Sequence, residues 1–246
     1  MTPHFRNAPA TENKLGDDDY DPVTVADRAA EELLRTRIEE AHPEHGIFGE
    51  EFGHREGNGL TWVLDPIDGT RAFISGFVHW GMLVALYDGR VPVLGVLHQP
   101  FLGETFSGDG ESASYERVAG TVVGQRTLRA RSCASLAEAV IGTTHPGCFP
   151  DPADFRRFEA LADRCRMLRY GGDCYGYAMV AMGQLDLVVE TALNAYDIQA
   201  LIPIVRGAGG VITSWDGGDP SLGGSAIAAG DSRVHEQALE ILNSDA

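Results

Sequence analysis

The stretch from Trp62 to Thr70, WVLDPIDGT, limits the possible folds of this chain more than any other part of it. An apolar run typical of a buried strand leads directly into two carboxylates, a proline, a glycine and a hydroxyl. The proline stiffens the turn after Asp65, so Asp65 and Asp68 can converge on one point, where the Ile67 carbonyl offers a third oxygen. Hard divalent cations prefer such oxygen ligands. The stretch therefore predicts a strand that ends in a divalent-metal site.

The end of the same stretch suits a phosphate group. Gly69 lacks the Cβ atom that would keep a phosphate away from the backbone, and Thr70 places a hydroxyl where a water molecule could be oriented. A simpler interpretation is an Asp-rich turn that closes a strand, because Asp-Gly is a common turn pair. Together the residues indicate a phosphate bound beside magnesium.

Two more acidic elements accompany this stretch. Gly49-Glu50-Glu51 follows a short apolar run, and Tyr196-Asp197 precedes a helical pattern and the pair Gly209-Gly210. In this order the elements resemble the inositol monophosphatase superfamily, whose members share a Gly-Glu-Glu element, an Asp-Pro-Ile-Asp-Gly-Thr element and a late Trp-Asp or Tyr-Asp element before a Gly-Gly turn. The resemblance covers roughly residues 14 to 230.

The resemblance implies a fold of the α/β (α+β) class, a layered α-β-α-β-α sandwich of the inositol monophosphatase and fructose-1,6-bisphosphatase type. The alternation of strand and helix patterns fits that class independently. We expect a single domain over residues 1–246, with the metal motifs in an N-terminal half (about 14–120) and the substrate wall in a C-terminal half (about 121–246). Family members usually begin with a further helix that appears absent here, and we expect either reduced stability or a homodimer.

The resemblance also implies a role for individual residues. The metal ligands would be Glu50, Asp65, Asp68, Asp197 and the Ile67 carbonyl, holding roughly two to three Mg²⁺ ions. The catalytic residues would be Glu50, Thr70 and Asp27, the last from the pattern Asp21, Thr24, Asp27, and Lys14 would lie near a third metal. Capping offers another explanation at two of these positions, because Asp27 can complete a capping box with Thr24 and Asp197 can cap a helix.

The C-terminal half indicates the substrate. The segment Arg169 to Tyr175 and the strand ending at Glu190 look like the histidinol-phosphate phosphatase branch of the superfamily, which acts at a late step of histidine biosynthesis. Histidinol phosphate carries an ammonium group and an imidazole, so an acidic pocket wall would favour it over inositol phosphates. Asp173 could instead cap the following helix, and Arg169 could be a surface residue. The expected substrate-binding residues are Ile67, Asp68, Gly69, Thr70, Arg169, Gly172, Asp173, Glu190 and Asp197.

Composition narrows the class of partner. Lys and Arg total 19 against 36 Asp and Glu, a net charge of −17, which disfavours nucleic acid and anionic membrane surfaces. The four cysteines are scattered, which suggests neither a zinc site nor a disulfide framework. No signal peptide or membrane span is evident, so we expect a cytoplasmic protein with a small phosphorylated substrate. The alternatives are an inositol-1-monophosphatase, a broad-specificity sugar or nucleotide phosphatase, and a partner-binding regulatory protein of the same fold.

Local patterns predict individual elements. Residues 1–23 look irregular, and Thr24 would cap a helix with an apolar stripe at Val25, Ala29, Leu33 and Ile38. Asp88-Gly89-Arg90 would join a hairpin, whereas residues 109–124 lose periodicity and would form an irregular seam between the halves. Pro203 would disturb a helix from Asp197 to Gly207, which a left-handed glycine would end. The other predicted elements are strands at 103–107, 139–143, 166–170 and 185–190 and helices at 151–163 and 174–182.

Overall fold

A computed structural model describes residues 1–7, 11–13, 22–120 and 122–244. Lys14 and Asp21, for which the sequence predicts roles near the metal, lie outside the described residues. Short strands β1 (Thr11–Asn13) and β2 (Pro22–Thr24) pair antiparallel, so the N-terminal segment is less irregular than predicted. None of the helices in the described ranges is both long enough and apolar enough to span a membrane.

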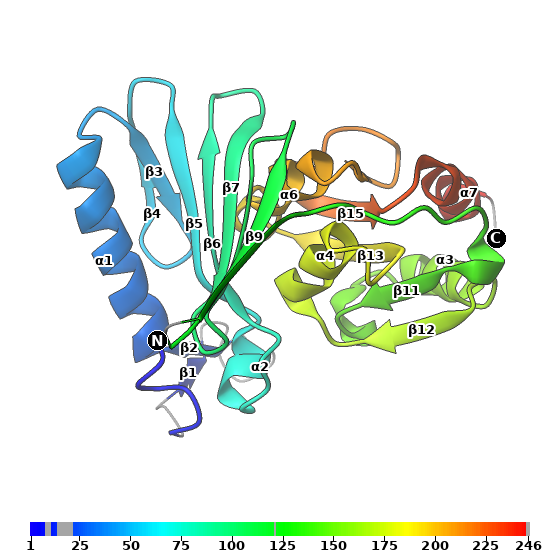
Figure 1. The fold of residues 1–246 in the computed structure, drawn as a ribbon, viewed down its shortest axis with the longest axis horizontal. Helices are drawn as coiled ribbons and strands as arrows, with labels where there is room; N and C mark the ends of the chain where they lie inside the picture. Colours follow the sequence, from blue (N-terminus) through cyan, green and yellow to red (C-terminus); the bar gives the residue numbers. More distant parts are fainter. Residues whose placement is uncertain (8–10, 14–21, 121, 245–246) are drawn as a thin grey trace.

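Two mixed sheets and the helices around them form the molecule (Figure 1). The first sheet holds β3 (Gly46–Gly49), β4 (Gly53–Arg55), β5 (Thr61–Asp68), β6 (Gly81–Tyr87), β7 (Pro92–Gln99), β8 (Glu104–Gly108), β9 (Ala113–Ala119) and β10 (Val122–Thr127). The second holds β11 (Val140–Thr143), β12 (Met167–Tyr170), β13 (Leu187–Leu193), β14 (Val211–Thr213) and β15 (Gly224–Ala229). Among the described strands their orders are β10-β9-β8-β7-β6-β5-β3-β4 and β12-β11-β13-β15-β14.

The helices occupy three layers around these sheets. In Figure 1, α1 (Val25–Ala41) lies outside the first sheet, α4 (Asp173–Ala181) and α6 (Leu201–Gly207) lie between the sheets, and α3 (Pro152–Ala162) and α7 (Ser232–Leu242) lie outside the second. This arrangement confirms the predicted α-β-α-β-α sandwich. The remaining short elements are α2 (Thr70–Ile74), α5 (Ala195–Ile198) and the 3₁₀ turns η1 (Leu136–Glu138) and η2 (Pro146–Cys148).

The two central helices join the sheets in one apolar core. That core takes Leu83 and Leu97 from the first sheet, Tyr177 from α4, Ile204 from α6 and Val188 from the second sheet, and all five are buried. A helix between two sheets must be apolar on every side. The sequence of α4, DCYGYAMVA, meets this condition and leaves its polar first residue at the end of the helix.

Helix α1 begins as predicted but presents a different face. Thr24 caps it, and Asp27 accepts the Thr24 backbone N–H at 2.8 Å, which confirms the capping box. The predicted apolar stripe is wrong at Val25 and Leu33, which are 50% and 59% exposed, and at the exposed Ala29. Of its four positions Ile38 alone is buried. The face against the protein instead carries the buried acidic residues Asp27 and Glu31.

Other boundaries confirm or correct the sequence analysis. The Asp88 turn joins β6 to β7 as a hairpin. Residues 109–124 are not an irregular seam, because they contain β9 and the first half of β10, which extend the first sheet. The predicted helix 197–207 is two helices, α5 and α6. The break precedes Pro203, whose nitrogen cannot donate to the Gln199 carbonyl, and Gly209 follows α6 with the predicted left-handed φ of 86°.

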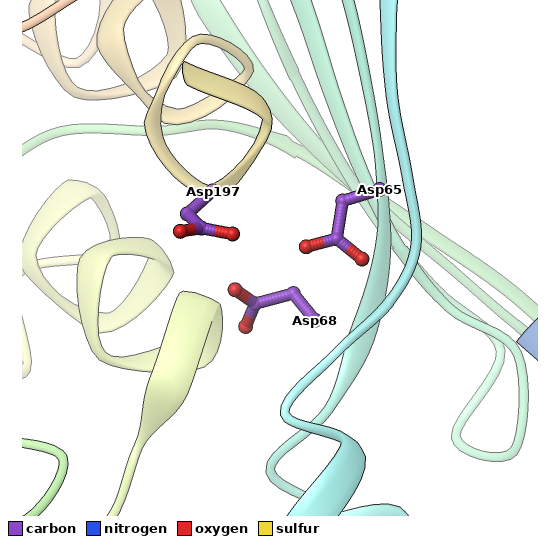
Figure 2. A group of neighbouring side chains, drawn as sticks. All are labelled: Asp65, Asp68 and Asp197. Carbon is purple, nitrogen blue, oxygen red and sulfur yellow. The ribbon is translucent and has the colours of Figure 1, made fainter. Parts of the chain in front are cut away.

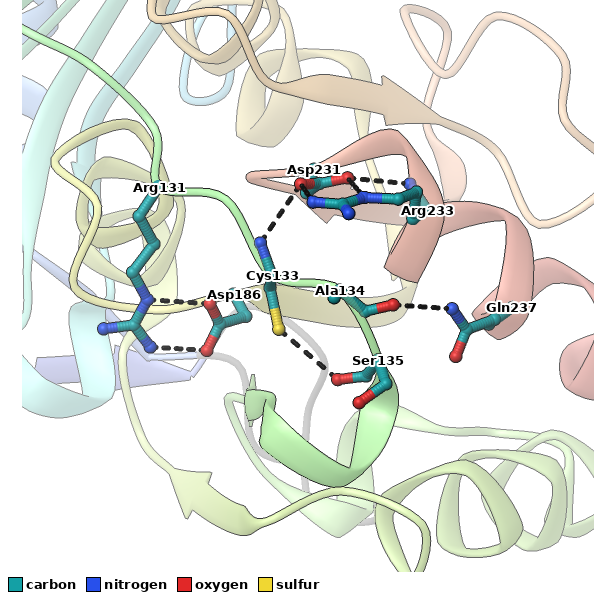
Figure 3. A network of polar contacts seen from close by, with 8 residues as sticks. All are labelled: Arg131, Cys133, Ala134, Ser135, Asp186, Asp231, Arg233 and Gln237. Atoms are coloured by element: carbon teal, nitrogen blue, oxygen red, sulfur yellow. Dashed lines mark hydrogen bonds and ion pairs between the residues drawn. The ribbon is translucent and has the colours of Figure 1, made fainter.

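A polar network fastens the segment that runs from β10 to β11 (Figure 3). Arg131 makes two hydrogen bonds to the buried carboxylate of Asp186, one of them Nε to Oδ1 at 2.7 Å. Further along, the Cys133 backbone N–H donates to Asp231 at 3.1 Å, and Gln237 donates to the Ala134 carbonyl at 3.3 Å. Side chains of the second sheet and of α7 therefore hold the connection between the two sheets.

Candidate functional site: an acidic pocket between the two sheets

The two motif carboxylates share one side of β5 because the strand is bulged. In a regular strand, residues three apart point to opposite faces. Asp65 pairs with Leu83 and Asp68 with Gly81, so three residue steps on β5 match two on β6. One extra residue reverses the alternation of side chains. The bulge at Pro66 and Ile67 is therefore what brings Asp65 and Asp68 together.

The residues after the bulge are packed too tightly for a larger side chain. Gly69 has a φ of 83°, and a Cβ atom there would lie 2.6 Å from the His79 carbonyl oxygen and 3.2 Å from the Asp173 side chain. Glycine is therefore required on both conformational and steric grounds. The next residue, Thr70, begins α2 and donates its hydroxyl to the Ile67 carbonyl at 3.0 Å. This contact orients the Ile67 carbonyl, the predicted third oxygen ligand.

The third carboxylate comes from the C-terminal half. Asp197 lies in the single turn of α5, where its Oδ2 accepts the Asn194 backbone N–H at 2.6 Å. This bond completes a capping box, so the predicted capping role is real. Asp197 also faces Asp65 and Asp68 across the gap between the sheets (Figure 2). Capping and metal binding are therefore compatible at this residue.

The carboxylates of Asp65, Asp68 and Asp197 form a compact acidic group. Each offers an oxygen within 4.8 Å of the other two. Burial, and then the charge of Glu50, raise the pKa of Asp65 well above its ordinary value; burial, and then Asp173, do the same for Asp68. The Oδ1 atom of Asp65 is buried without a hydrogen-bond partner. An oxygen-only group with an unsatisfied buried acceptor fits a hard divalent cation, which would neutralise this repulsion.

Two other predicted site residues lie beside this group. Glu50 lines the same pocket and acts electrostatically on Asp65, but it is outside the set whose oxygens lie within 4.8 Å of one another. Asp27 also raises the pKa of Asp65, while its Oδ2 accepts the Thr24 hydroxyl at 2.5 Å. Both residues therefore belong to the surroundings of Asp65.

A pocket of about 560 Å³ opens next to the acidic group. It is lined by Glu50, Asp68, Gly69, Thr70, Asp173, Glu190 and Asp197, all predicted from the sequence. Three predicted substrate-binding residues are placed differently. Ile67 is fully buried and does not line the pocket. The exposed Arg169 and the half-buried Gly172 line a small adjoining cavity of about 20 Å³, and Gly171 lines the pocket instead. Arg169 lies on β12, the edge strand of the second sheet, and does not line the larger pocket.

Two further carboxylates in the pocket lining belong to Asp173 and Glu190. Burial, and then Glu190, raise the pKa of Asp173 to about 7. Burial raises the pKa of Glu190, although hydrogen bonds from Thr144 and Tyr177 oppose the shift. Asp173 does not cap α4 with its side chain, because Gly172 occupies the cap position. The capping alternative for Asp173 is therefore wrong.

The N-terminus of α4 points at the acidic group. The backbone N–H of Cys174 donates to Oδ1 of Asp68 at 2.7 Å. Backbone N–H groups at a helix start carry partial positive charge and favour anions. This helix end therefore holds Asp68 in place at the floor of the pocket.

Several lining residues were missed by sequence reasoning, and three of them carry a charge to the pocket or bind Glu190. Arg71 brings a positive charge to the mouth of the pocket, and Thr144 and Tyr177 bind Glu190. Arg71 directly follows the Asp65–Thr70 motif, so its place in the sequence could have indicated that it lies at the pocket. Thr144 and Tyr177 gave none, because their contacts depend on how β11, α4 and β13 pack.

Known proteins similar to this chain in sequence include phosphatases. A family model described as the inositol monophosphatase family matches residues 2–245. The bifunctional phosphatase IMPL2, chloroplastic, of Arabidopsis thaliana is 40% identical over 92% of this chain, which spans 66% of that protein. A histidinol-phosphatase of Chlorobaculum parvum is 34% identical over 88% of this chain and 81% of its own length.

A solved structure gives the same result for the fold. The structure of an inositol monophosphatase from Zymomonas mobilis superposes with a TM-score of 0.82 at 39% identity. It covers 99% of this chain and 91% of its own chain. The similarity therefore includes both sheets and the pocket between them.

Proposed function

The chain belongs to the inositol monophosphatase family, and from this membership we propose that it is a magnesium-dependent phosphomonoesterase whose substrate is histidinol phosphate. The family consists of phosphatases, so the coarse activity is hydrolysis of a phosphomonoester. The observation that carries the proposal is the meeting of the buried Asp65 with Asp68 and Asp197, which line an open pocket.

The described residues fit hydrolysis without a covalent intermediate. Mg²⁺ ions held by Asp65, Asp68, Asp197, Glu50 and the Ile67 carbonyl would supply positive charge to the phosphate and acidify nearby water. Glu50 and Thr70 would orient the attacking water. Because Gly69 has no Cβ, the phosphate could approach the backbone closely there. Asp27 would act indirectly, through its electrostatic effect on Asp65. Because phosphate ester hydrolysis is so slow without a catalyst, electrostatic stabilisation must dominate.

The preference for histidinol phosphate is supported by the charge of the pocket wall. Asp173 and Glu190 both line the pocket, and Asp173 lies near enough to Asp68 to raise its pKa. Histidinol phosphate presents an ammonium group and an imidazole, which such a wall attracts, whereas an inositol phosphate presents hydroxyls alone. A histidinol-phosphatase among the relatives agrees with this choice.

The expected assembly and location follow the same proposal. We propose that the protein acts as a homodimer in a reducing compartment such as the cytoplasm, where its thiols stay reduced. The exposed apolar residues Val25 and Leu33 on α1 offer surface that association could cover.

The direct test compares two substrates. Phosphate release is measured from histidinol phosphate and inositol 1-phosphate, each with magnesium and with a chelator. We expect magnesium-dependent turnover and a preference of at least about tenfold for histidinol phosphate, the ratio that one charge-assisted hydrogen bond provides. Equal rates on both substrates would identify a broad-specificity enzyme, and turnover that survives complete chelation would contradict the metal assignment.

A further inference from the structure

We infer that Thr144 is a positioning residue that fixes Asp173 and Glu190 as one cation-binding wall and so sets substrate preference. Thr144 follows β11 and touches both acidic residues. The inference rests on the proposed function, because it explains how the same pocket would select a positively charged phosphomonoester.

The first contact is with Glu190. The backbone N–H and the hydroxyl of Thr144 both donate to Oε1 of Glu190, at 3.0 and 2.5 Å. The hydroxyl of Tyr177 donates to Oε2 at 2.9 Å. Both carboxylate oxygens therefore have donors from the protein, and Glu190, which is 5% exposed, is held in one orientation.

The second contact is with Asp173. Its backbone N–H donates to the Thr144 hydroxyl oxygen at 3.1 Å. A carboxylate can only accept hydrogen bonds, so the Thr144 proton points to Glu190 and its lone pair is left for the Asp173 amide. One hydroxyl thus fixes the distance between two acidic residues that come from β13 and the start of α4.

The backbone of Asp173 requires such support. Its φ of 45° is positive, a conformation that is uncommon for residues other than glycine, although Asp adopts it more often than most. Backbone strain of this kind persists where the surroundings hold the residue in place, and it is concentrated at functional sites. The hydrogen bond from the Asp173 backbone N–H to Thr144 holds this conformation in place. On the other side, the missing Cβ of Gly69 leaves room for the Asp173 side chain.

The fixed wall favours one class of ligand. Asp173 and Glu190 lie in the same pocket, with Arg71 at its mouth. Two carboxylates held on one wall attract an ammonium or imidazolium group, and a rigid pair loses less entropy on binding than a mobile one. A neutral substrate gains nothing from this arrangement, so the Thr144 hydroxyl should affect binding of cationic substrates selectively.

Two substitutions separate this role from a general packing role. Thr144→Val keeps the shape and the hydrogen bonds made by the backbone of residue 144, including the Gly171 N–H to Thr144 carbonyl bond at 2.9 Å, but removes the hydroxyl. Thr144→Ser restores the hydroxyl with less bulk. Asp173→Asn and Glu190→Gln are the matched charge controls, because they keep the size of each side chain.

The experiment measures kcat and KM on histidinol phosphate and on 4-nitrophenyl phosphate, which carries no cation, at saturating magnesium. For Thr144→Val we expect KM for histidinol phosphate to rise about 10- to 100-fold, the loss typical of hydrogen bonds to charged groups. The effect on 4-nitrophenyl phosphate should be at least about tenfold smaller, and Thr144→Ser should recover most of the preference. Circular dichroism checks that each variant is folded.

The outcomes are distinguishable. Equal losses on both substrates in folded Thr144→Val, or an unchanged substrate ratio, would overturn the role of Thr144. If Thr144→Val does not fold, failure of Thr144→Ser to keep the preference overturns it equally. If the wild-type protein turns over both substrates without preference, the proposed histidinol-phosphate function has failed and this inference falls with it.

Discussion

At the scale of single residues, the site is a group of carboxylates that repel one another when no cation is bound. Asp65, Asp68 and Asp197 lie within 4.8 Å of one another, and one oxygen of Asp65 is buried without a partner. Such a group costs folding free energy in the metal-free protein. Function and stability are therefore opposed at Asp65, as is usual for residues arranged for catalysis.

Replacing Asp65 by Asn should reveal this opposition. Asp65→Asn keeps the shape but removes a repelled charge, so the metal-free variant should be at least as stable as the wild type. Magnesium at about 100 times its dissociation constant should stabilise the wild type by about 2.7 kcal/mol and the variant hardly at all, and activity should fall by at least about 100-fold. Thermal unfolding with and without magnesium tests this; equal stabilisation of both proteins would exclude Asp65 as a ligand.

A second residue-scale prediction concerns Glu31, whose buried carboxylate holds the turn after Glu50. It accepts the Glu51 and Phe52 backbone N–H groups at 2.7 and 3.2 Å and pairs with Arg35. Glu31→Gln should therefore cost about 3 kcal/mol in urea unfolding, as for other broken buried pairs. It should also raise the magnesium concentration needed for half-maximal activity, because Glu50 would be less firmly placed.

Two further variants act as checks on Glu31. A Cβ atom at Gly49 would lie 1.9 Å from the Glu31 carboxylate, so Gly49→Ala should displace the carboxylate and reproduce the shift in magnesium response. Glu40 forms an exposed pair with Arg37 on the same helix, and Glu40→Gln should change stability by less than about 0.5 kcal/mol. A loss of stability in Glu31→Gln with an unchanged magnesium response would mean that Glu31 only supports packing.

At the scale of elements, the sequence predicted what is decided locally. The Thr24 cap, the Asp88 turn and the disturbed helix before Pro203 depend on neighbouring residues, and all three are present. The β9–β10 hairpin escaped prediction because its described outer residues, such as Arg117 and Gln125, are polar and exposed at a sheet edge. The stripe of α1 was misplaced because the helix buries acidic side chains, against the usual pattern.

The site shows the same division. The carboxylates of the three motifs could be selected from the sequence because each lies at the end of a strand or in the first turn of a helix. The partners of Glu190 were not, because Thr144 lies 46 residues away in sequence. Arg169 does not line the larger pocket for a related reason: its place at the edge of the second sheet depends on strand order, which no local pattern reveals.

An element-scale prediction follows from the two acidic caps in the C-terminal half. Asp231 caps α7 and also accepts the distant Cys133 N–H, whereas the side chain of Asp151 caps α3 through Ala153. Asp151→Ala should cost about 1 kcal/mol and Asp231→Ala about 2 kcal/mol in urea unfolding at pH 7. Equal costs would show that the bond to Cys133 adds nothing.

The Asp231 contribution should also depend on pH. The Arg233 side chain holds the pKa of Asp231 well below its ordinary value of 3.8 in the folded protein. A carboxylate with a depressed pKa stabilises the fold above the unfolded pKa, and this stabilisation is lost as pH falls through the folded value. The stability difference between wild type and Asp231→Ala should therefore be full at pH 7 and smaller at pH 3. A difference that stays constant between these pH values would contradict the assignment.

At the scale of the whole molecule, the two sheets share a core, and the segment that joins β10 to β11 is held by side-chain hydrogen bonds. Val63 of the first sheet and Ala228 of the second belong to the same buried cluster around α4 and α6. The Arg131 to Asp186 pair anchors the connecting segment, and Asp186 also accepts the Val140 N–H at 2.7 Å (Figure 3). Neither sheet can lose this core without exposing the other, so we expect them to unfold together.

Replacing Asp186 tests that cooperativity. Asp186→Ala leaves Arg131 without this carboxylate and should cost about 3 kcal/mol, which corresponds to roughly 6–12 °C in Tm for a chain of this length. Amide hydrogen exchange should then report the same fall in opening free energy for β5 in the first sheet and β13 in the second, because both depend on the shared core. If β13 alone loses protection, the sheets are separate cooperative units and the pocket between them is held by contacts weaker than the common core.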